Sequence, residues 1–413
     1  MIKNRVVITG IGVVSPIGIG RASFWKALTE GKSGIKPVSL FDTSKVGSKL
    51  AGEIGNFVPE EILGQKALRN LDRTTLLGLC AAKLCLDDAH FQVNEENAND
   101  VGVVLGSTMG GVWSINEFDK EGVRNGPRSV NPALFPNTVM NAPASQISIR
   151  FGIKGFNTTI STGFTSSLEA LEYAKQFIAL NRASSVLVGG VEELCEQTYK
   201  GCYKLKFLSG SKEEHSELCA PFDRRRNGAV LGEGSVMFLL ENYESAKKRN
   251  AKIYAELKGV GSAYDEDSFY RYNIKVVGAK RAIERALQES DIALEDIDYV
   301  ASGANSTLDG DVAESRALQF TLGMVQKNVV ASSSKSMIGE TFSAGGAFQV
   351  ATGLLSLDQR VIPPTINFEK KDIRCQVDCV PNEARQAKIR NVLVTNLSPM
   401  GQNAAAVLSK DSL

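Results

Sequence analysis

Histidine is the scarcest catalytic side chain in this sequence, because only His90 and His215 occur among 413 residues. His90 follows the acidic pair at 87–88, and His215 lies in the polar stretch that starts at 211. Both are predicted to be exposed, His90 at a helix end where a cation is favourable. Histidine is the side chain most often used for proton transfer near neutral pH. This count therefore limits the available chemistry more than any other feature of the composition.

A membrane-spanning segment and a strong charge imbalance are also missing. No apolar run approaches the length of about 20 residues that a helix needs to cross a bilayer. The first five residues lead directly into a predicted strand at 6–9, without the pattern of a signal peptide. The formal net charge is +1, which gives no reason to expect a nucleic-acid partner. We therefore expect a cytoplasmic protein that binds neither membranes nor nucleic acid.

The seven cysteines are odd in number and lie mostly in apolar surroundings. Cys375 and Cys379 are close in sequence, but no histidine and no second cysteine pair accompany them, so a structural role is favoured over metal binding. Cys195 and Cys202 follow a predicted strand, and nothing in the sequence places them in a cleft. We expect reduced thiols, and neither a metal nor a cofactor bound by this chain.

The stretch 158–194 is the most informative part of the chain. Residues 158–160 are β-branched and 185–191 form a short apolar run, and both patterns predict strands. Between them, apolar side chains recur at helical spacing: Leu168, Leu171, Ala174 and Ile178. A side chain at the turn before this helix lies at the positive end of the helix dipole, where a cysteine would be an activated nucleophile. The sequence has Phe164 at this turn, and phenylalanine has neither a nucleophile nor a proton to give.

The pattern of strands and helices repeats along the chain. Four pairs of segments correspond: helices at 76–89 and 279–288, strands with glycine-rich loops at 101–111 and 297–307, strand–turn–helix units at 158–180 and 329–357, and closing strands at 185–191 and 392–397. The chain is therefore predicted to divide into two similar α/β halves, 1–253 and 254–413. Alternating strands and helices predict parallel or mixed sheets that helices cover on both faces.

Two segments carry a resemblance to a known family. The turn at 162–167, TGFTSS, is similar to the active-site turn of the β-ketoacyl synthases, in which a cysteine stands at the position of Phe164. These are the condensing enzymes of fatty acid and type II polyketide synthesis. The stretch 220–234 resembles a second motif of the same family, and the resemblance covers essentially the whole chain. It implies a thiolase-like fold with two pseudo-symmetric halves in five layers, an active site between them, and dimer-interface and tunnel insertions in the first half.

The stretch 220–234 also contains charged residues whose partners the sequence does not name. Arg224, Arg225 and Arg226 could bind a phosphate or pair with acidic neighbours, and pairing is the favoured interpretation. Glu233 lies in an otherwise apolar, strand-like run, so it must be paired if it is buried.

The resemblance implies a catalytic set of one cysteine, two histidines and one lysine. Gly303 stands where the first histidine would begin its loop, and Glu340 stands where the second histidine would follow the Lys-Ser-x-x-Gly motif. A carboxylate there would repel a developing enolate, so Glu340 is expected to form an ion pair with the retained Lys335. The gate loop of the family is also replaced, by residues 398–403. We therefore predict no catalytic residue in this chain: Phe164, Gly303 and Glu340 are degenerate positions.

A chain that keeps the fold and loses the chemistry resembles the chain length factor, or ketosynthase β-subunit, of type II polyketide synthases. This resemblance implies a heterodimer with an active β-ketoacyl synthase, and an acyl carrier protein whose phosphopantetheine delivers the substrates. It places Met109, Val112, Trp113 and Leu134 nearest to the acyl tunnel, where they would set the length of the product. Trp113 would either plug the end of the tunnel or be an ordinary core or interface aromatic.

Two other functions stay open. The chain could be a condensing enzyme of fatty acid or aryl polyene synthesis that uses an unrecognised nucleophile, although the combination of Phe164, Gly303 and Glu340 argues against it. It could also be a homodimeric acyl-binding scaffold without an enzyme partner. Co-purification with an active ketosynthase would separate a scaffold from a heterodimer subunit.

Overall fold

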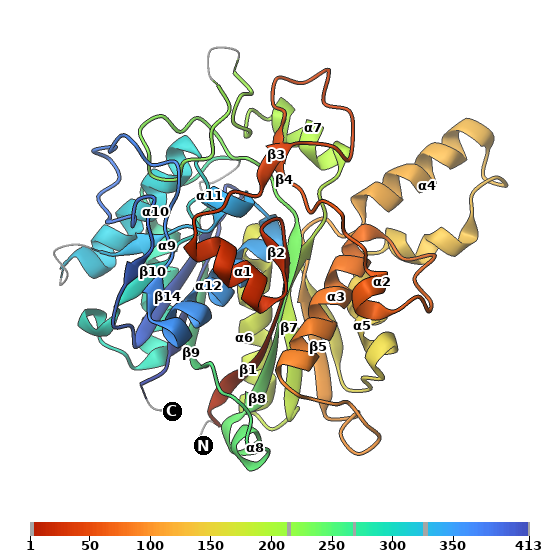
Figure 1. Ribbon diagram of the computed structural model, residues 1–413, viewed down its shortest axis with the longest axis horizontal. Coiled ribbons are helices and arrows are strands. Elements are labelled where there is room, and N and C mark those ends of the chain that lie inside the picture. The colour runs from red at the N-terminus through yellow and green to blue at the C-terminus, as the bar shows by residue number, and fades with distance from the viewer. Residues whose placement is uncertain (1–3, 213–215, 267–269, 325–328, 412–413) are drawn as a thin grey trace.

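The computed structural model describes residues 4–212, 216–266, 270–324 and 329–411. His215 therefore lies outside the described residues, whereas His90 is exposed as predicted. A mixed sheet of eleven strands runs through the molecule in the order β11-β10-β14-β15-β9-β1-β8-β7-β5-β6, with β2 paired to β1. Helices lie on both sides of this sheet and between its two halves (Figure 1).

Each half of the chain contributes five main strands with the same arrangement. The first half supplies β1 Val6–Ser15, β5 Val101–Gly106, β6 Asn157–Ile160, β7 Ser185–Glu192 and β8 Gly234–Asn242. The second half supplies β9 Ala255–Tyr264, β10 Tyr299–Ala301, β11 Ala331–Ser332, β14 Asn391–Leu397 and β15 Gln402–Ser409. Three outer strands are parallel in each half, β6-β5-β7 and β11-β10-β14, and two antiparallel strands follow toward the centre. The predicted pseudo-symmetry is thereby confirmed.

The two half-sheets meet at a short junction. β1 pairs with β9 through two residue pairs, Val7 with Glu256 and Ile8 with Ala255. Six helices complete the layers: α3 Arg73–Asp88 and α5 Ala142–Phe151, α6 Ser166–Ala179 and α12 Gly345–Gln359, and α9 Val277–Ser290 and α10 Leu308–Thr321. α3 and α5 pack on the first half-sheet, α6 and α12 pack on each other between the half-sheets, and α9 packs on the second half-sheet and on α10. The five-layer thiolase-like fold is confirmed.

Burial explains why α6 lies in the centre. The four side chains that recur at helical spacing, Leu168, Leu171, Ala174 and Ile178, are all buried, as predicted. In α12, residues from Gly345 to Leu357 are buried all around the helix, as expected for a helix that is covered on every side. The two central helices therefore fix the turns that precede them, and these turns hold the candidate site.

Shorter or peripheral elements decorate this frame. They are β2 Gly18–Ile19, α1 Arg21–Thr29, β3 Ile35–Pro37, β4 Leu50–Gly52, α2 Glu60–Leu63, α4 Val112–Asn125, η1 Pro132–Thr138, α7 Glu196–Lys204, α8 Tyr243–Lys248, α11 Lys335–Ile338, β12 Val361–Ile362 and β13 Arg385–Gln386. α4 extends away from the body of the molecule (Figure 1). Among the described residues, no helix has both the length and the apolar composition needed to cross a membrane.

Candidate functional site

Phe164 lies in a one-turn 3-10 helix, η2 Gly163–Thr165, that connects β6 to α6. Gly163 has φ +67°, a left-handed conformation that glycine adopts without a Cβ penalty. The Phe164 side chain is 6% exposed and meets Phe342 edge-to-face at a ring-centroid distance of 5.0 Å. A second edge contact reaches Phe207 at 6.0 Å. The predicted nucleophile position is therefore filled by an aromatic cluster with favourable edge-to-face geometry.

Gly303 follows the end of β10 by two residues, and the structure has no space for a side chain at this position. A Cβ at this position would lie 2.7 Å from Asn396 Oδ1 and 2.8 Å from the Thr395 carbonyl oxygen. The backbone N–H of Gly303 donates a 2.9 Å hydrogen bond to Glu314 Oε1. The crowding by β14 is tertiary, and nothing in the sequence around 303 indicated it.

Lys335 and Glu340 form the predicted ion pair. Lys335 Nζ lies 2.9 Å from Glu340 Oε2, and both side chains are fully buried. Lys335 Nζ also donates to Asn396 Oδ1 at 3.0 Å. The other oxygen of Glu340 accepts the backbone N–H of Phe342 at 2.9 Å. Because each charge has further hydrogen bonds, the pair meets the conditions under which a buried ion pair is tolerated.

The ion pair belongs to a longer polar network that the sequence did not reveal. Asn305 Nδ2 donates to Glu340 Oε2 and to the Tyr272 hydroxyl, each at 2.8 Å. On the other side, Asn396 Nδ2 donates to the carbonyl oxygen of Phe164 at 2.5 Å. Burial raises the pKa of Tyr272 well above its usual value, so its phenol stays neutral. The network thus links Tyr272, through Asn305, Glu340, Lys335 and Asn396, to the turn that carries Phe164.

Glu314 is a second buried acid next to this network. Its side chain accepts hydrogen bonds from the Gly303 N–H and from the Thr395 hydroxyl. Burial raises the pKa of Glu314 to about 7. Because it accepts from both segments, Glu314 holds the loop at 303 against β14.

The thiols near the site are protonated. Cys202 packs against the cluster that contains Phe164 and Phe342, which corrects the expectation that nothing would place it at the cleft. Cys202 lies in α7, and its proximity to this cluster cannot be read from the sequence. Burial raises the pKa of Cys202 to about 12 and that of Cys219 to about 12. Neither is an activated thiolate near neutral pH.

The four tunnel candidates occupy two neighbouring elements. Met109 and Val112 lie just before and at the start of α4 and Leu134 lies in η1, and all three are half-buried. Trp113 is 50% exposed and lines a surface cavity of about 510 Å³. Trp113 is therefore not a core aromatic, because half of its surface is accessible, whereas its place at a tunnel or at an interface stays a prediction. Phe118 of α4 packs on Phe135 of η1, with ring centroids 5.8 Å apart.

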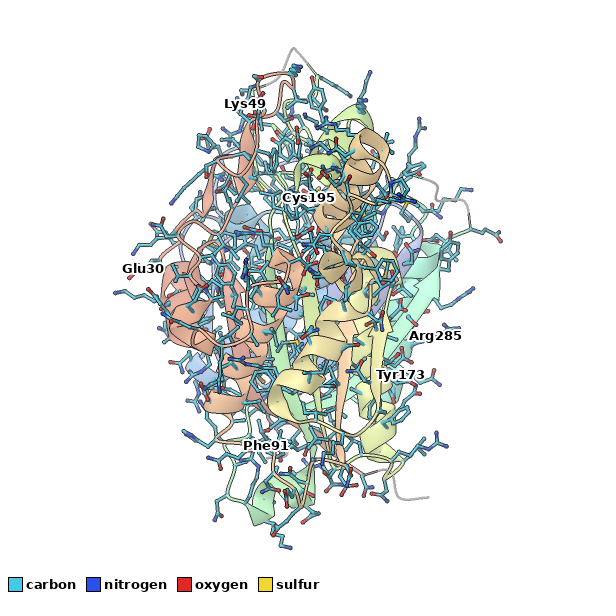
Figure 2. The ribbon with its side chains drawn as sticks, turned by 90° about the vertical axis from the view of Figure 1, so that its right-hand side faces the viewer. Glu30, Lys49, Phe91, Tyr173, Cys195 and Arg285 are labelled. Carbon is cyan, nitrogen blue, oxygen red and sulfur yellow. The ribbon has the colours of Figure 1, made fainter. Side chains whose placement is uncertain are left out.

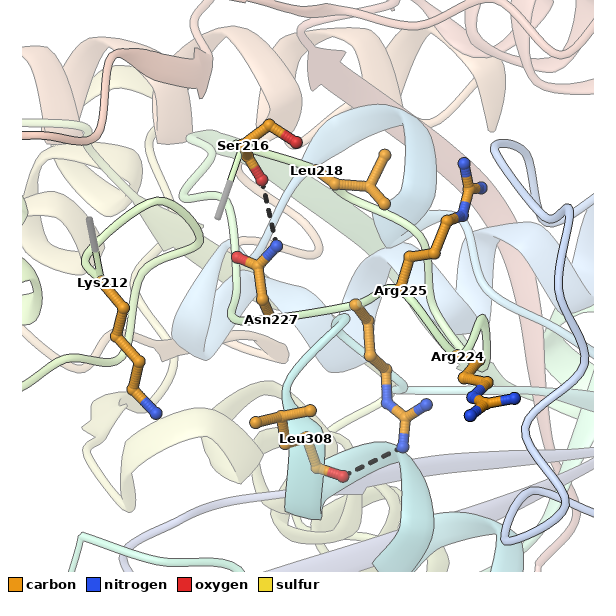
Figure 3. A pocket seen from close by; sticks show the side chains of 8 residues that line it. Lys212, Ser216, Leu218, Arg224, Arg225, Asn227 and Leu308 are labelled. Atoms are coloured by element: carbon orange, nitrogen blue, oxygen red, sulfur yellow. Dashed lines mark hydrogen bonds between the residues drawn. The ribbon is translucent and has the colours of Figure 1, made fainter. Parts of the chain in front are cut away.

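The arginine run at 224–226 mainly pairs with acids, as predicted. Arg226 is buried and lies 2.8 Å from Asp372 and 3.4 Å from Asp311. Arg225 forms ion pairs with Asp223 at 3.0 Å and with Glu369 at 2.6 Å. Figure 3 shows the pocket beside this run, where Lys212, Arg224 and Arg225 point in different directions rather than toward one another. Their charges therefore do not converge on a single phosphate position.

Glu233 is also paired, as its burial required. Arg73 donates to its two oxygens at distances of 2.7 and 2.6 Å, and Glu233 is fully buried. This bidentate pair joins the start of α3 to the segment that leads into β8.

Comparisons with known proteins agree with the geometry. The model "Beta-ketoacyl synthase, N-terminal domain" matches residues 3–246, and "Beta-ketoacyl synthase, C-terminal domain" matches residues 254–369. The chain is 36% identical over 412 residues to the 3-oxoacyl-[acyl-carrier-protein] synthase 2 of Coxiella burnetii, which covers 99% of each chain. The synthase of the same name from Vibrio harveyi is also 36% identical over 412 residues, with 99% of each chain covered.

Two solved structures are similar over nearly the full length. The ishigamide ketosynthase/chain length factor superposes with a TM-score of 0.92 at 28% identity, over 98% of this chain and 99% of that chain. A type II polyketide synthase acyl-carrier protein in complex with its ketosynthase gives a TM-score of 0.91 at 26% identity, again over 98% and 99%. The similarity therefore includes both halves and the junction between them.

Proposed function

Because this chain belongs to the β-ketoacyl synthase family, we propose that it is a non-catalytic chain length factor. It pairs with an active β-ketoacyl synthase, shapes the acyl tunnel and sets the chain length in type II polyketide biosynthesis. The observation that carries this proposal is the buried ring of Phe164 at the strand-to-helix turn where the family has its cysteine. A phenyl ring can neither attack a thioester nor be made to do so by a neighbouring base.

The rest of the site supports the same conclusion. Condensation needs hydrogen-bond donors for the developing enolate oxygen. At the two histidine positions this chain has Gly303, without space for a side chain, and Glu340, an acceptor already bonded to Lys335. The phosphopantetheine arm of an acyl carrier protein would therefore deliver its acyl group to the cysteine of the partner, because the residues around Phe164 offer it no nucleophile.

A partner subunit is supported by the surface beside β6. This strand ends the sheet order, so one of its edges has no strand neighbour in the described part of the chain. α5 and α6 contact β6, η1 contacts α5, and α4 contacts η1. Large apolar side chains are exposed on these four helices and on the loop at 139–140: Trp113, Ile115, Val123, Phe135, Val139, Met140, Ile149 and Tyr173. Figure 2, which looks onto the side that carries α4, labels Tyr173 on α6 and Cys195 before α7. An open strand edge with a large apolar surface is typical of a protein-binding site.

A second candidate function is favoured by the relatives of the chain. The curated proteins at 36% identity are 3-oxoacyl-[acyl-carrier-protein] synthases, so a condensing enzyme of fatty acid or aryl polyene synthesis is the alternative. It would need a nucleophile outside the turn, and the thiol that packs on the Phe164 cluster, Cys202, is protonated because burial raises its pKa to about 12. A homodimeric acyl-binding scaffold is the third possibility.

Co-expression with a ketosynthase that keeps its cysteine and both histidines tests the proposal. We expect a one-to-one complex in size-exclusion chromatography, because the exposed surface around β6 needs a partner. Intact-protein mass spectrometry after incubation with an acylated acyl carrier protein should find the acyl group on the ketosynthase alone. An acyl group on this chain would favour the condensing enzyme. A stable homodimer that ignores the ketosynthase would favour the scaffold.

A further inference from the structure

A cavity of about 510 Å³ opens beside the first turn of α4. It lies between the loop at 40–42, the start of α3, and the segment at 193–196 that joins β7 to α7. Its apolar walls are formed by Leu40, Phe41, Leu71, Trp113 and Leu194. Leu40 and Trp113 are 43% and 50% exposed, so they form the rim, whereas Leu194 is buried. None of the catalytic positions of the family lines this cavity.

Two buried carboxylates also line the cavity. Glu193 is 4% exposed and accepts the backbone N–H of Trp113 at 3.0 Å. Asp72 is 6% exposed and accepts the N–H of Thr75 at 2.8 Å, where it caps α3. Among the residues that the structure describes, no lysine, arginine or histidine forms an ion pair with either carboxylate. Buried carboxylates without a cationic partner are rare in proteins.

The arginine in the wall does not supply the missing charge. Arg73 lines the cavity but donates two hydrogen bonds, of 2.7 and 2.6 Å, to Glu233. Its charge is shared with Glu233, so no cation among the described residues forms an ion pair with Glu193 or Asp72. Burial raises the pKa of Glu193 to about 7 and also raises that of Asp72, and a bound cation would favour the ionised form of each. The described residues contain no group of three metal-ligating side chains, and the cavity is much larger than an ion.

Aromatic walls next to carboxylates favour an organic cation. The face of an indole or phenyl ring attracts a guanidinium or ammonium group, and a carboxylate can accept its hydrogen bonds. The long aliphatic part of such a side chain fits apolar walls such as Leu40 and Leu71. The cavity therefore has the composition that receives the end of an arginine or lysine side chain.

We propose that this cavity receives an arginine or lysine side chain of the protein that binds against α4. Trp113 belongs to both the cavity wall and α4, and the exposed apolar surface continues from it to Ile115 and to Phe135 on η1. The inference rests on the proposed function in one respect: the active ketosynthase subunit is the protein that presents the cation. The preference of the cavity for a cation is independent of that function.

The first experiment measures this preference on the full-length chain alone. Two neutral-capped amides of similar shape, Nα-acetylarginine amide and Nα-acetylcitrulline amide, are titrated and followed by ligand-detected NMR. At pH 8, above the raised pKa of Glu193, we expect only the arginine derivative to bind measurably, and Glu193→Gln should weaken its binding about tenfold, because the charge is lost. The glutamine keeps an oxygen to accept the Trp113 N–H. Trp113→Leu, a change at an exposed position, should also weaken binding.

Asp119→Asn is the matched control, because Asp119 is an exposed carboxylate of α4 that does not line the cavity. It removes the same charge from the same region of the surface and should leave probe binding unchanged. Equal binding of the arginine and citrulline amides would overturn the inference. It would also be overturned if Asp119→Asn weakened binding as much as Glu193→Gln, because net charge would then explain the effect.

The second experiment uses the complex with the ketosynthase. Glu193→Gln should weaken the pair about tenfold relative to Asp119→Asn in biolayer interferometry. If Glu193→Gln and Asp119→Asn changed the affinity between the two subunits equally, the inference would be overturned and the proposed function would stay intact. Selective binding of the arginine probe by a chain that does not pair would contradict the proposed function, and the cavity would still be a cation site.

Discussion

The buried site around Phe164, called the cleft after its place in the family, and the surface around α4 both contain aromatic rings and charged groups. These groups are buried and paired in the first region and partly accessible in the second. In the cleft, aromatic rings are buried against one another, and the charges of Lys335 and Glu340 are paired at 2.9 Å. Around α4, the ring of Trp113 is half exposed and the buried carboxylate of Glu193 faces an open cavity. The buried groups around Phe164 thus have partners within the chain, whereas side chains around α4 are accessible to a second molecule.

Because of this difference, we expect substitutions in the two regions to affect different properties of the protein. Substitutions in the cleft should change the free energy of unfolding, because the charged and aromatic groups there have internal partners. Substitutions around α4 should instead change assembly or product length, because the groups there are accessible.

The largest effect is expected from breaking the buried ion pair. Lys335→Met leaves the Glu340 carboxylate buried without its cation, which should cost about 3–5 kcal/mol of unfolding free energy. The double variant Lys335→Met/Glu340→Leu should recover most of this loss, because an apolar pair needs no desolvation of charge. Urea denaturation followed by circular dichroism measures both.

Lys83→Met is the control for this prediction. Lys83 forms an exposed ion pair with Asp87 on α3, and such pairs contribute less than about 1 kcal/mol. If Lys335→Met cost no more than Lys83→Met, the polar network would not hold the cleft together, and the contrast between cleft and surface would fail.

A smaller loss of stability is expected when the nucleophile position is restored. Phe164→Cys removes most of a ring that packs on Phe342 and Phe207, so we expect a cost of about 2–4 kcal/mol. The variant should still not become acylated or condense malonyl units. Glu340 remains a paired carboxylate, and no histidine fits at Gly303 while Asn396 lies 2.7 Å from its Cβ position.

Intact-protein mass spectrometry of Phe164→Cys with an acylated acyl carrier protein measures the outcome, with the active ketosynthase as the positive control. Acylation of the introduced thiol followed by condensation would mean that the cleft retains a working enolate site. In that case the degenerate positions would not have removed the chemistry.

The pH dependence of stability gives a third test of the cleft. Burial raises the pKa of Glu314 from an ordinary 4.5 to about 7. Between these values the folded chain keeps a proton that the unfolded chain has lost, so this group makes the fold less stable as pH rises from about 4.5 to 7. The loss is on the order of 1–3 kcal/mol. Glu314→Gln should make the slope smaller, because an amide does not titrate, and Glu193, whose pKa burial also raises to about 7, should maintain part of it.

Unfolding free energies at pH 5 and pH 8, for the natural chain and for Glu314→Gln, measure this effect. Glu61→Gln, at an exposed position, is the control and should leave the slope unchanged. An identical slope in all three proteins would show that Glu314 is ionised in the folded chain throughout this range.

The sequence predicts what depends on local order. The apolar periodicity at Leu168, Leu171, Ala174 and Ile178 predicted the buried face of α6, and the repeat of strands and helices predicted the two halves. Lys335 and Glu340 are five residues apart around a one-turn helix, so their pairing could be foreseen from the motif.

Other features of the site depend on residues that are distant in sequence. Asn396 comes from β14, far beyond Gly303 in the chain, and it decides both the crowding at 303 and the second hydrogen bond of Lys335. Tyr272 reaches the network from a loop that has no recognisable pattern. Cys202 packs against the Phe164 cluster from α7, which follows the turn by about 30 residues in the chain. Only the folded chain brings these groups together.

The smallest effect on stability is expected at Trp113. Its side chain is half exposed, so Trp113→Ala should cost no more than about 1 kcal/mol, instead of the roughly 3–5 kcal/mol of a core position. If the indole also borders the path of the growing chain, its removal opens space, and the heterodimer should make a product longer by one or more two-carbon units. The mass of the product measures its chain length, and the melting temperature of the complex measures its stability. Met109, Val112 and Leu134 are half-buried neighbours around α4 and η1, and their alanine variants are the comparison set. An unchanged product from well-folded variants at all four positions would mean that this surface binds the partner without deciding the chain length.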